Sequence, residues 1–213
     1  MPKLKKGLFI TFEGPEGSGK STQSKMLVDH LIGQGYDVIA TREPGGTKLG
    51  QLIRQILLDP ENTGMARLAE ILLFSADRAQ HVQEKILPAL EAQKIVICDR
   101  YVDSTTAYQI YGRGLEPKLI KTLNKISSND LLPLRTYLLD IPVDQGLKRA
   151  TRITADRFEK EYLSFHEQVR KGYLQVAADN KKRIKISSGL DPIELVHQAI
   201  VKDIEHLLKQ HAL

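Results

Sequence analysis

The fold of this chain is decided by the stretch GPEGSGKS at residues 14–21. It fits the phosphate-binding pattern G-x-x-x-x-G-K-S/T at every fixed position. An apolar run at residues 8–12 precedes it and has the composition of a strand buried on both faces. Residues 21–32 follow with a helical repeat of leucine, valine and isoleucine. A glycine-rich turn that matches by chance is the alternative, but strand, loop and helix in this order are the context that the pattern requires.

The chemistry of this loop is anion binding. Its glycines let successive N–H groups turn inward, and the positive end of the following helix adds to the field. In such loops the lysine reaches the β- and γ-phosphates and the hydroxyl contacts Mg²⁺. The sequence therefore predicts a nucleoside triphosphate site formed by Gly14, Pro15, Glu16, Gly17, Ser18, Gly19, Lys20 and Ser21.

Composition limits the class of protein. With 213 residues, 41% of them apolar and 27% charged, the chain is expected to form one domain over residues 1–213. No apolar run approaches the roughly 20 residues of a membrane span, and the basic N-terminus lacks the apolar region of a signal peptide. The single cysteine, Cys98, excludes an internal disulfide and suits a reducing cytoplasm.

The net charge of +5 indicates an anionic partner. The basic residues are dispersed, without a stripe of interleaved aromatic residues, so phosphorylated small molecules explain the charge at least as well as nucleic acid. We therefore expect small-molecule substrates, and neither a nucleic acid nor a membrane as partner.

Strand-like and helix-like segments alternate along the chain. We expect strands at residues 8–12, 37–41, 95–98, 136–139 and 183–186. Helical spacing covers residues 21–32, 48–58, 66–90 (bent or ended near Pro88), 117–126 and 192–208, with a further stripe around residues 165–176. This alternation predicts an α/β fold with a five-stranded parallel sheet and helices on both faces.

Ligands of such sheets gather at the carboxyl ends of the strands. Asp99 ends the third strand, where a carboxylate helps to hold Mg²⁺, often through water. Arg42 and Arg100 also stand at strand ends, and Arg54 and Arg78 lie on helices, where simple solvation is an equal alternative. Because a guanidinium binds phosphate oxygens bidentately, this number of arginines indicates a second phosphorylated substrate.

A third cluster of arginines lies in a segment of low hydrophobicity between two helices. We expect residues 149–160, which include Arg149, Arg152 and Arg157, to form a lid over the triphosphate; a solvated helix end is the alternative. The loop positions between Gly14 and Gly19 carry no arginine, so the charge that stabilises phosphoryl transfer has to come from elsewhere.

At this point nearly the whole chain resembles the thymidylate kinase family, whose members move the γ-phosphoryl group of ATP to dTMP. The resemblance rests on TFEGPEGSGKS, TREPGGT, LLFSADRAQH, CDRYVDSTTAYQ and a lid of the form R-x-x-R-x-x-x-x-R. It implies the fold of P-loop nucleoside monophosphate kinases, Mg²⁺ held near Ser21 and Asp99, and a homodimer. The arginine-rich lid and arginine-free loop match the bacterial style of the family.

The resemblance also implies a role for each matching residue. Phe74 would stack on thymine, Arg78 would bond its carbonyl edge, and Tyr108 would disfavour a ribose 2′-hydroxyl. Lys20 and Arg100 would join Arg152 and Arg157 of the lid in catalysis. Arg149 would lie in the ATP site, and which of the three lid arginines contacts the triphosphate stays open. The implied dTMP site consists of Glu13, Arg42, Arg54, Phe74, Arg78, Arg100, Ser104, Thr105, Tyr108 and Gln109.

Two other functions stay open at this stage. One is a kinase for another nucleoside monophosphate on the same scaffold. The other is a GTP-binding switch, but the nearest match to its guanine-reading N/T-K-x-D motif, NKIS at residues 124–127, lacks the acid and lies in an expected helix. The six histidines are scattered, which argues against a histidine metal site.

Overall fold

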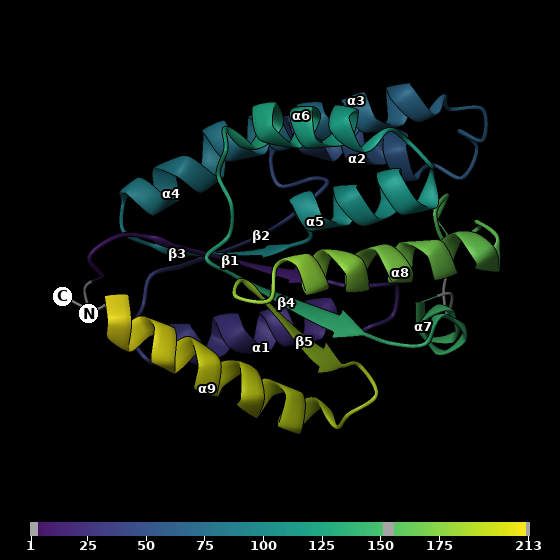
Figure 1. The fold of residues 1–213 in the computed structure, drawn as a ribbon. Coiled ribbons are helices and arrows are strands. Elements are labelled where there is room, and N and C mark those ends of the chain that lie inside the picture. The colour runs from purple at the N-terminus through teal and green to yellow at the C-terminus, as the bar shows by residue number, and fades with distance from the viewer. Residues whose placement is uncertain (1–3, 151–155, 212–213) are drawn as a thin grey trace.

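The computed structural model describes residues 4–150 and 156–211. Five parallel strands form one sheet in the order β2-β3-β1-β4-β5, with β1 in the centre (Figure 1). The expected α/β fold, with a five-stranded parallel sheet and helices on both faces, is confirmed.

The elements alternate as the sequence pattern predicts. The strands are β1 (Leu8–Glu13), β2 (Val38–Arg42), β3 (Ile95–Asp99), β4 (Arg135–Asp140) and β5 (Ile184–Ser188). The helices are α1 (Lys20–Gly33), α2 (Lys48–Leu58), α3 (Arg67–His81), α4 (Leu87–Glu91), α5 (Val102–Thr105), α6 (Pro117–Ser128), α7 (Val143–Ala150), α8 (Leu163–Asp179) and α9 (Ile193–His211). Two π-helical segments, η1 (Val82–Ile86) and η2 (Thr106–Gly112), join α3 to α4 and extend α5.

The central strand is buried on both faces because its side chains alternate between two cores. Leu8, Ile10 and Phe12 pack against α1 and α9 on one side of the sheet. Phe9 packs on the other side, in a cluster with Val82 and Ile86 of η1, the segment that joins α3 to α4. A buried strand of this kind fixes the loop that follows it, and that loop is the phosphate-binding stretch.

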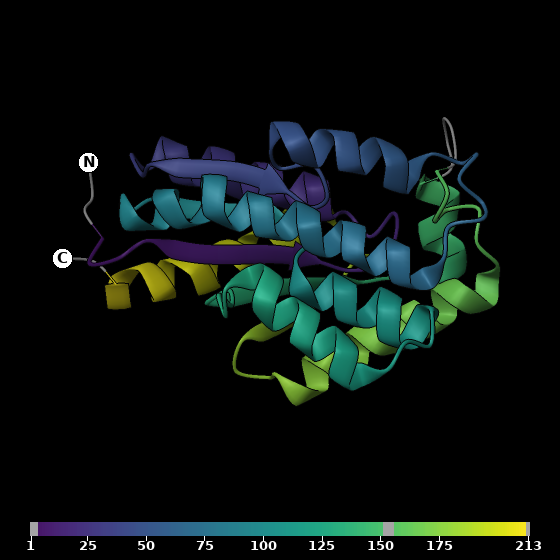
Figure 2. The ribbon, with the colours of Figure 1, turned by 90° about the horizontal axis from the view of Figure 1, so that it is seen from above.

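The helices form two layers of unequal size. Helices α1 and α9 lie along one face of the sheet, and the remaining helices cover the other face and its carboxyl end (Figure 1). Seen from above, α3 lies between α2 and α6 (Figure 2). The described residues include no helix that is long and apolar enough to cross a membrane.

The bend or end that the sequence predicts near Pro88 is present as a change of winding, and one helical segment was not predicted. The long helix expected over residues 66–90 changes its winding at η1, just before Pro88, and then continues as α4. Proline lacks an N–H and crowds the preceding turn, and a wider π turn at this point accommodates it. The sequence pattern also missed α5 and η2, which carry several residues of the implied dTMP site.

Candidate active site

The phosphate loop runs from the end of β1 to the start of α1. Three of its glycines have positive φ angles, 143° at Gly14, 66° at Gly17 and 96° at Gly19, which residues with a side chain rarely adopt. The loop lines a cavity of about 440 Å³, together with Arg42, Arg54, Arg100 and Arg149. Four guanidiniums around a loop of inward-facing N–H groups make this a cavity for a polyphosphate.

Lys20 is nearly buried in the loop, and its Nζ donates to the carbonyl oxygen of Pro15 at 2.7 Å. Burial and the neighbouring charge of Arg100 lower the pKa of Lys20 to about 8. An anion in the cavity would favour the ammonium form, so Lys20 is suited to bind phosphate oxygens.

Ser21 and Asp99 lie at the edge of the same cavity, where the Ser21 hydroxyl donates to Oδ2 of Asp99 at 2.6 Å. Hydroxyl and carboxylate oxygens are the hard donors that Mg²⁺ prefers, and this ion usually completes its shell with water and substrate phosphates. Within the described residues, no three or more His, Cys, Asp or Glu side chains gather into a metal cage. The two residues therefore fit a nucleotide-borne Mg²⁺.

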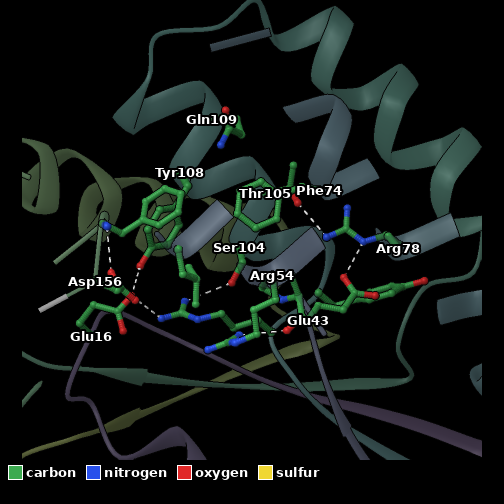
Figure 3. Close-up of a pocket in the computed structure, with 15 residues that line it drawn as sticks. Glu16, Glu43, Arg54, Phe74, Arg78, Ser104, Thr105, Tyr108, Gln109 and Asp156 are labelled. Carbon is green, nitrogen blue, oxygen red and sulfur yellow. Dashed lines mark hydrogen bonds and ion pairs between the residues drawn. The ribbon is translucent and has the colours of Figure 1, made fainter. Parts of the chain in front are cut away.

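A second cavity, of about 110 Å³, opens beside the first (Figure 3). Its walls include the half-buried Phe74 and the nearly buried Arg78 of α3, and Ser104, Thr105, Tyr108 and Gln109 of α5 and η2. The two cavities share Glu16, Glu43, Arg54 and Arg100. A ligand with an aromatic ring would meet Phe74 at one end and arginine at the other.

Arg78 is held by three neighbours. Its Nε donates to Oε2 of Glu43 at 2.8 Å, its Nη2 to Oγ1 of Thr105 at 2.8 Å and its Nη1 to Oδ1 of Asn124 at 2.9 Å. Glu43 in turn contacts Nδ1 of His81 at 3.0 Å. These contacts fix the guanidinium at the wall of the second cavity (Figure 3).

Arg100 lies where the two cavities meet and has a φ angle of 70°. Its Nη2 forms an ion pair with Oε1 of Glu16 at 2.7 Å, and its Nη1 donates to Gly14 O at 3.1 Å and to the hydroxyl of Tyr173 at 2.8 Å. Tyr108 donates to the same oxygen of Glu16 at 2.7 Å. Burial acts to raise the pKa of Glu16, but the charges of Arg100 and Lys20 outweigh this effect and lower the pKa to about 2.

Glu13 lies beneath this junction. It is 1% exposed and accepts from the N–H of Tyr101 at 2.7 Å and from the hydroxyl of Ser104 at 2.5 Å. Burial and the nearby Asp103 raise the pKa of Glu13 to about 8. The carboxyl supports the backbone just after Arg100, and it reaches the second cavity through Ser104.

The predicted lid arginines are divided. Arg149 lines the phosphate cavity, and its Nη1 donates to Gly189 O at 2.8 Å. Arg152 lies outside the described residues. Arg157 turns away from the phosphate loop: it is 8% exposed, and its side chain contacts Glu70 Oε2 at 2.6 Å and Leu57 O at 2.8 Å. The structure therefore does not bring Arg157 to the predicted triphosphate site.

Sequence reasoning placed several further residues in the cleft or the lid but gave them no role of their own. Glu43 lines both cavities, Asp156 and Phe158 line the second, and Glu159 lines the first. A further groove of about 420 Å³ continues the phosphate site between the loop, Arg149 and residues Gly189, Asp191 and Ile193. Phe158 could have been found as an aromatic residue inside a charged segment. The groove could not, because it depends on a loop between β5 and α9 that carries no motif.

A phosphate loop, an adjoining cavity with an aromatic wall, and arginines at the junction define a P-loop nucleotide kinase with two substrate sites. Comparison with known proteins makes the assignment specific. The family model described as thymidylate kinase matches residues 12–200. The chain belongs to the thymidylate kinase family.

Individual relatives agree with this assignment. The chain is 50% identical over 201 residues to a thymidylate kinase of Geotalea uraniireducens, which covers 91% of this chain and 94% of the relative. It is 52% identical over 180 residues to that of Halothermothrix orenii, covering 83% and 86%. The crystal structure of thymidylate kinase from Ehrlichia chaffeensis superposes with a TM-score of 0.77 at 37% identity, covering 93% of this chain and 98% of that one.

Proposed function

We propose that this chain phosphorylates dTMP to dTDP by direct in-line transfer of the γ-phosphoryl group of Mg-ATP. One observation carries the proposal. The polyphosphate cavity and the aromatic-walled cavity meet at Glu16, Arg54 and Arg100, so two nucleotides would bring their phosphates together there. Membership of the thymidylate kinase family supports dTMP as the acceptor and ATP as the donor.

In this proposal the donor site consists of the phosphate loop and the groove beside Arg149. Gly14 to Ser21 surround the β- and γ-phosphates, with Lys20 as the principal charge. The groove at Gly189 would receive the adenine end, because it continues the phosphate cavity along the start of α1. Arg152 keeps its proposed role as a catalytic lid group. For Arg157 the geometry favours an anchoring role over a catalytic one.

The acceptor site in this proposal begins at the aromatic wall. Phe74 stacks on the thymine ring, and Arg78 donates to its carbonyl edge. Arg42, Arg54 and Arg100 bind the monophosphate, and Tyr108 packs on the sugar. Ser104, Thr105 and Gln109 complete the walls, while Glu13 acts indirectly by supporting Ser104 and the backbone after Arg100.

Ser21 and Asp99 would hold Mg²⁺ together with the donor phosphates. The ion, when bound, neutralises charge on the transferring group. The chain itself supplies Lys20 and Arg100 close to the meeting point of the cavities, and Glu16 holds Arg100 in place at 2.7 Å. A nucleoside monophosphate has its second pKa near 6, by analogy with phosphorylated side chains, so its attacking oxygen is already anionic and requires no general base.

We further propose that the chain is one catalytic domain that works as a homodimer in the cytoplasm. Exposed apolar side chains on the neighbouring helices α2 and α3 support a second copy as partner: Leu49 (48% exposed), Leu52 (56%), Ile56 (47%), Leu68 (52%) and Leu72 (49%). The single cysteine, Cys98, is a free thiol, which agrees with a reducing compartment.

A coupled assay of ADP release tests the function. We expect turnover with Mg-ATP and dTMP to exceed turnover with dUMP, dCMP, AMP or GMP at equal concentration. The matched control is Lys20→Ala, which should abolish turnover but leave dTMP binding in place. A clear preference for another acceptor, or tight GTP binding without transfer to any acceptor, would contradict the proposal.

A further inference from the structure

Glu70 is a buried carboxylate for which the proposed mechanism has no use. It lies on α3 one turn before Phe74 and is 1% exposed. Three side chains donate to it: Gln109 through Nε2 at 2.8 Å, Arg113 through Nε and Nη2, both at 3.1 Å, and Arg157 through Nη1 at 2.6 Å. Although burial opposes it, the hydrogen bonds from Arg113 and Gln109 lower the pKa of Glu70, so the carboxylate carries its charge at neutral pH.

The donors come from two parts of the site. Gln109 lines the base cavity. Arg157 belongs to residues 156–161, which we call the strap. The N–H of Arg157 also donates to Leu58 O at 3.2 Å and its Nε to Leu57 O at 2.8 Å, so the strap is attached to the free carbonyls at the end of α2.

The strap lines both substrate cavities. Asp156 and Phe158 are walls of the base cavity, and Glu159 is a wall of the phosphate cavity. Asp156 Oδ1 accepts from the N–H groups of Phe158 at 2.8 Å and Glu159 at 2.9 Å, which makes the segment a compact turn. A displacement at Phe158 would therefore carry Glu159 with it.

The ring of Phe158 connects the strap to the base pocket. Its centroid lies 5.9 Å from that of Phe74 and 5.7 Å from that of Tyr108. The guanidinium of Arg157 lies 4.5 Å from the ring and that of Arg113 lies 5.5 Å from it. Both guanidiniums share Glu70 as their counter-charge, so one carboxylate holds the two cations that pack on this wall.

We propose that Glu70 is a positioning residue that ties the strap to the base pocket and thereby couples the binding of the two nucleotides. The proposal rests on the acceptor site described under Proposed function. A base against Phe74 would also contact Phe158, and Glu70 holds the strap so that Glu159 and its neighbours face the phosphate cavity. Because such coupling is reciprocal, ATP would favour dTMP binding by the same factor.

Loss of the Glu70 charge would release this arrangement. Within the part of the chain that the structure describes, the ion pair between Arg113 and Glu161 would remain, and Arg157 would lose its ion-pair partner. An uncompensated buried charge is strongly unfavourable. The strap would move outward to hydrate Arg157, while Phe74 and Arg78 on α3 would stay in place.

The test measures the dissociation constant of Mg-AMPPNP by calorimetry, with and without saturating dTMP. In the parent chain we expect dTMP to tighten AMPPNP binding about fivefold or more. Glu70→Gln, which keeps the size of the side chain, should reduce this factor to less than about twofold at dTMP concentrations that saturate the variant. The matched control is Glu84→Gln, an exposed residue at η1, which should keep the parent factor.

Arg157→Lys and Arg157→Gln provide a second route from the strap side. The lysine variant should keep part of the coupling between dTMP and AMPPNP, and the glutamine variant should lack it. Both should have the far-UV circular dichroism of the parent chain. If Glu70→Gln does not fold, these two variants test the inference in its place. Parent-like coupling in Glu70→Gln, or no coupling in the parent chain, would overturn the inference. Absence of dTMP turnover in the parent chain would instead refute the proposed function.

Discussion

At the residue level, two carboxylates three positions apart have opposite properties. Glu13 and Glu16 flank the start of the phosphate loop, and their pKa values are raised to about 8 and lowered to about 2, respectively. Burial and Asp103 act on Glu13, whereas Arg100 and Lys20 outweigh burial at Glu16. A carboxylate at Glu16 can therefore hold Arg100 at any physiological pH, and Glu13 is suited to a supporting hydrogen-bond role.

The lowered pKa of Lys20 leads to a pH prediction. The ammonium is the form that binds phosphate, and in the free chain it loses its proton as the pH rises through about 8. We expect kcat/KM for ATP to fall above that pH, by about tenfold per pH unit well above it, because this ratio reports the free enzyme. Initial rates at dTMP concentrations well below its KM, across a pH series, provide the measurement.

A matched variant separates this effect from others. Lys20→Arg keeps its charge at all these pH values, so whatever activity it retains should lack the break near pH 8. In the parent chain, kcat at saturating ATP should stay level over the same range, since bound phosphates raise the pKa of the lysine. A flat profile of kcat/KM for ATP in the parent would contradict the assignment.

The sequence predicted where a side chain lies when the local chain determines its position. The loop motif and the strand ends were sufficient to bring Ser21 next to Asp99, at 2.6 Å. They failed for Arg157, because the direction of its side chain is set by Glu70, 87 positions earlier, and by the end of α2. The available signal of Glu70 was an acid in the first turn of an amphipathic helix.

At the level of elements, the phosphate loop depends on a close contact with α7. A Cβ on Gly17 would lie 2.0 Å from Gly146 O, and a Cβ on Gly146 would lie 2.4 Å from Glu16 O. The loop backbone and the helix backbone therefore touch directly, without side chains between them. The helix that leads into the lid thus also supports the shape of the donor site.

Gly146→Ala tests this contact. Helix propensity favours alanine by about 1 kcal/mol, but overpacking against a backbone oxygen costs about 1–3 kcal/mol, since the carbonyl cannot swing aside as a side chain can. We expect a lower melting temperature and a fall of about tenfold or more in kcat/KM for ATP, which corresponds to about 1.4 kcal/mol. Activity assays and thermal unfolding measure the two effects.

Gly33→Ala is the control for this prediction. Gly33 ends α1, and a Cβ there meets nothing within 4 Å. This variant should match the parent in activity and equal or exceed it in stability. If Gly146→Ala behaved in the same way, the contact between loop and helix would have no functional role.

The element predictions succeeded and failed for physical reasons. Helix α2 has the bounds that apolar spacing predicted, Lys48–Leu58, because leucine and isoleucine recur there at helical intervals. The helical segment from Val102 to Gly112 escaped notice. Its threonines have low helix propensity, and π winding at η2 shifts the period away from the α-helical one.

At the level of the whole molecule, α3 is unusual because it buries charged side chains and exposes leucines. Leu68 and Leu72 are exposed, while Glu70, Asp77 and Arg78 are buried. Arg78 lines the acceptor site, and Leu68 and Leu72 are left at the surface next to the exposed side chains of α2. Exposed apolar residues on two neighbouring helices are typical of a protein interface, which agrees with the proposed homodimer.

Leu52→Glu tests the interface. A buried charge in an apolar interface is costly, so this substitution should shift the chain from the mass of a dimer to that of a monomer in sedimentation velocity. The control is Leu195→Glu, at a side chain of similar exposure (58% against 56%) on α9, across the sheet. A monomeric parent, or an unchanged dimer in Leu52→Glu, would contradict the proposal.

The anchoring of Arg78 has a consequence for the accuracy of the nucleotide pool. With Glu43, Thr105 and Asn124 on its three nitrogens, Arg78 cannot rotate away from a base that presents a donor. Cytosine carries an amino group where thymine carries a carbonyl oxygen, so donor would face donor. Uracil lacks only a methyl group. A missing methyl costs roughly 10–200-fold in selectivity, and an unpaired polar group on the order of 10⁴-fold. When this enzyme phosphorylates a wrong acceptor, we therefore expect dUMP to be used far more often than dCMP.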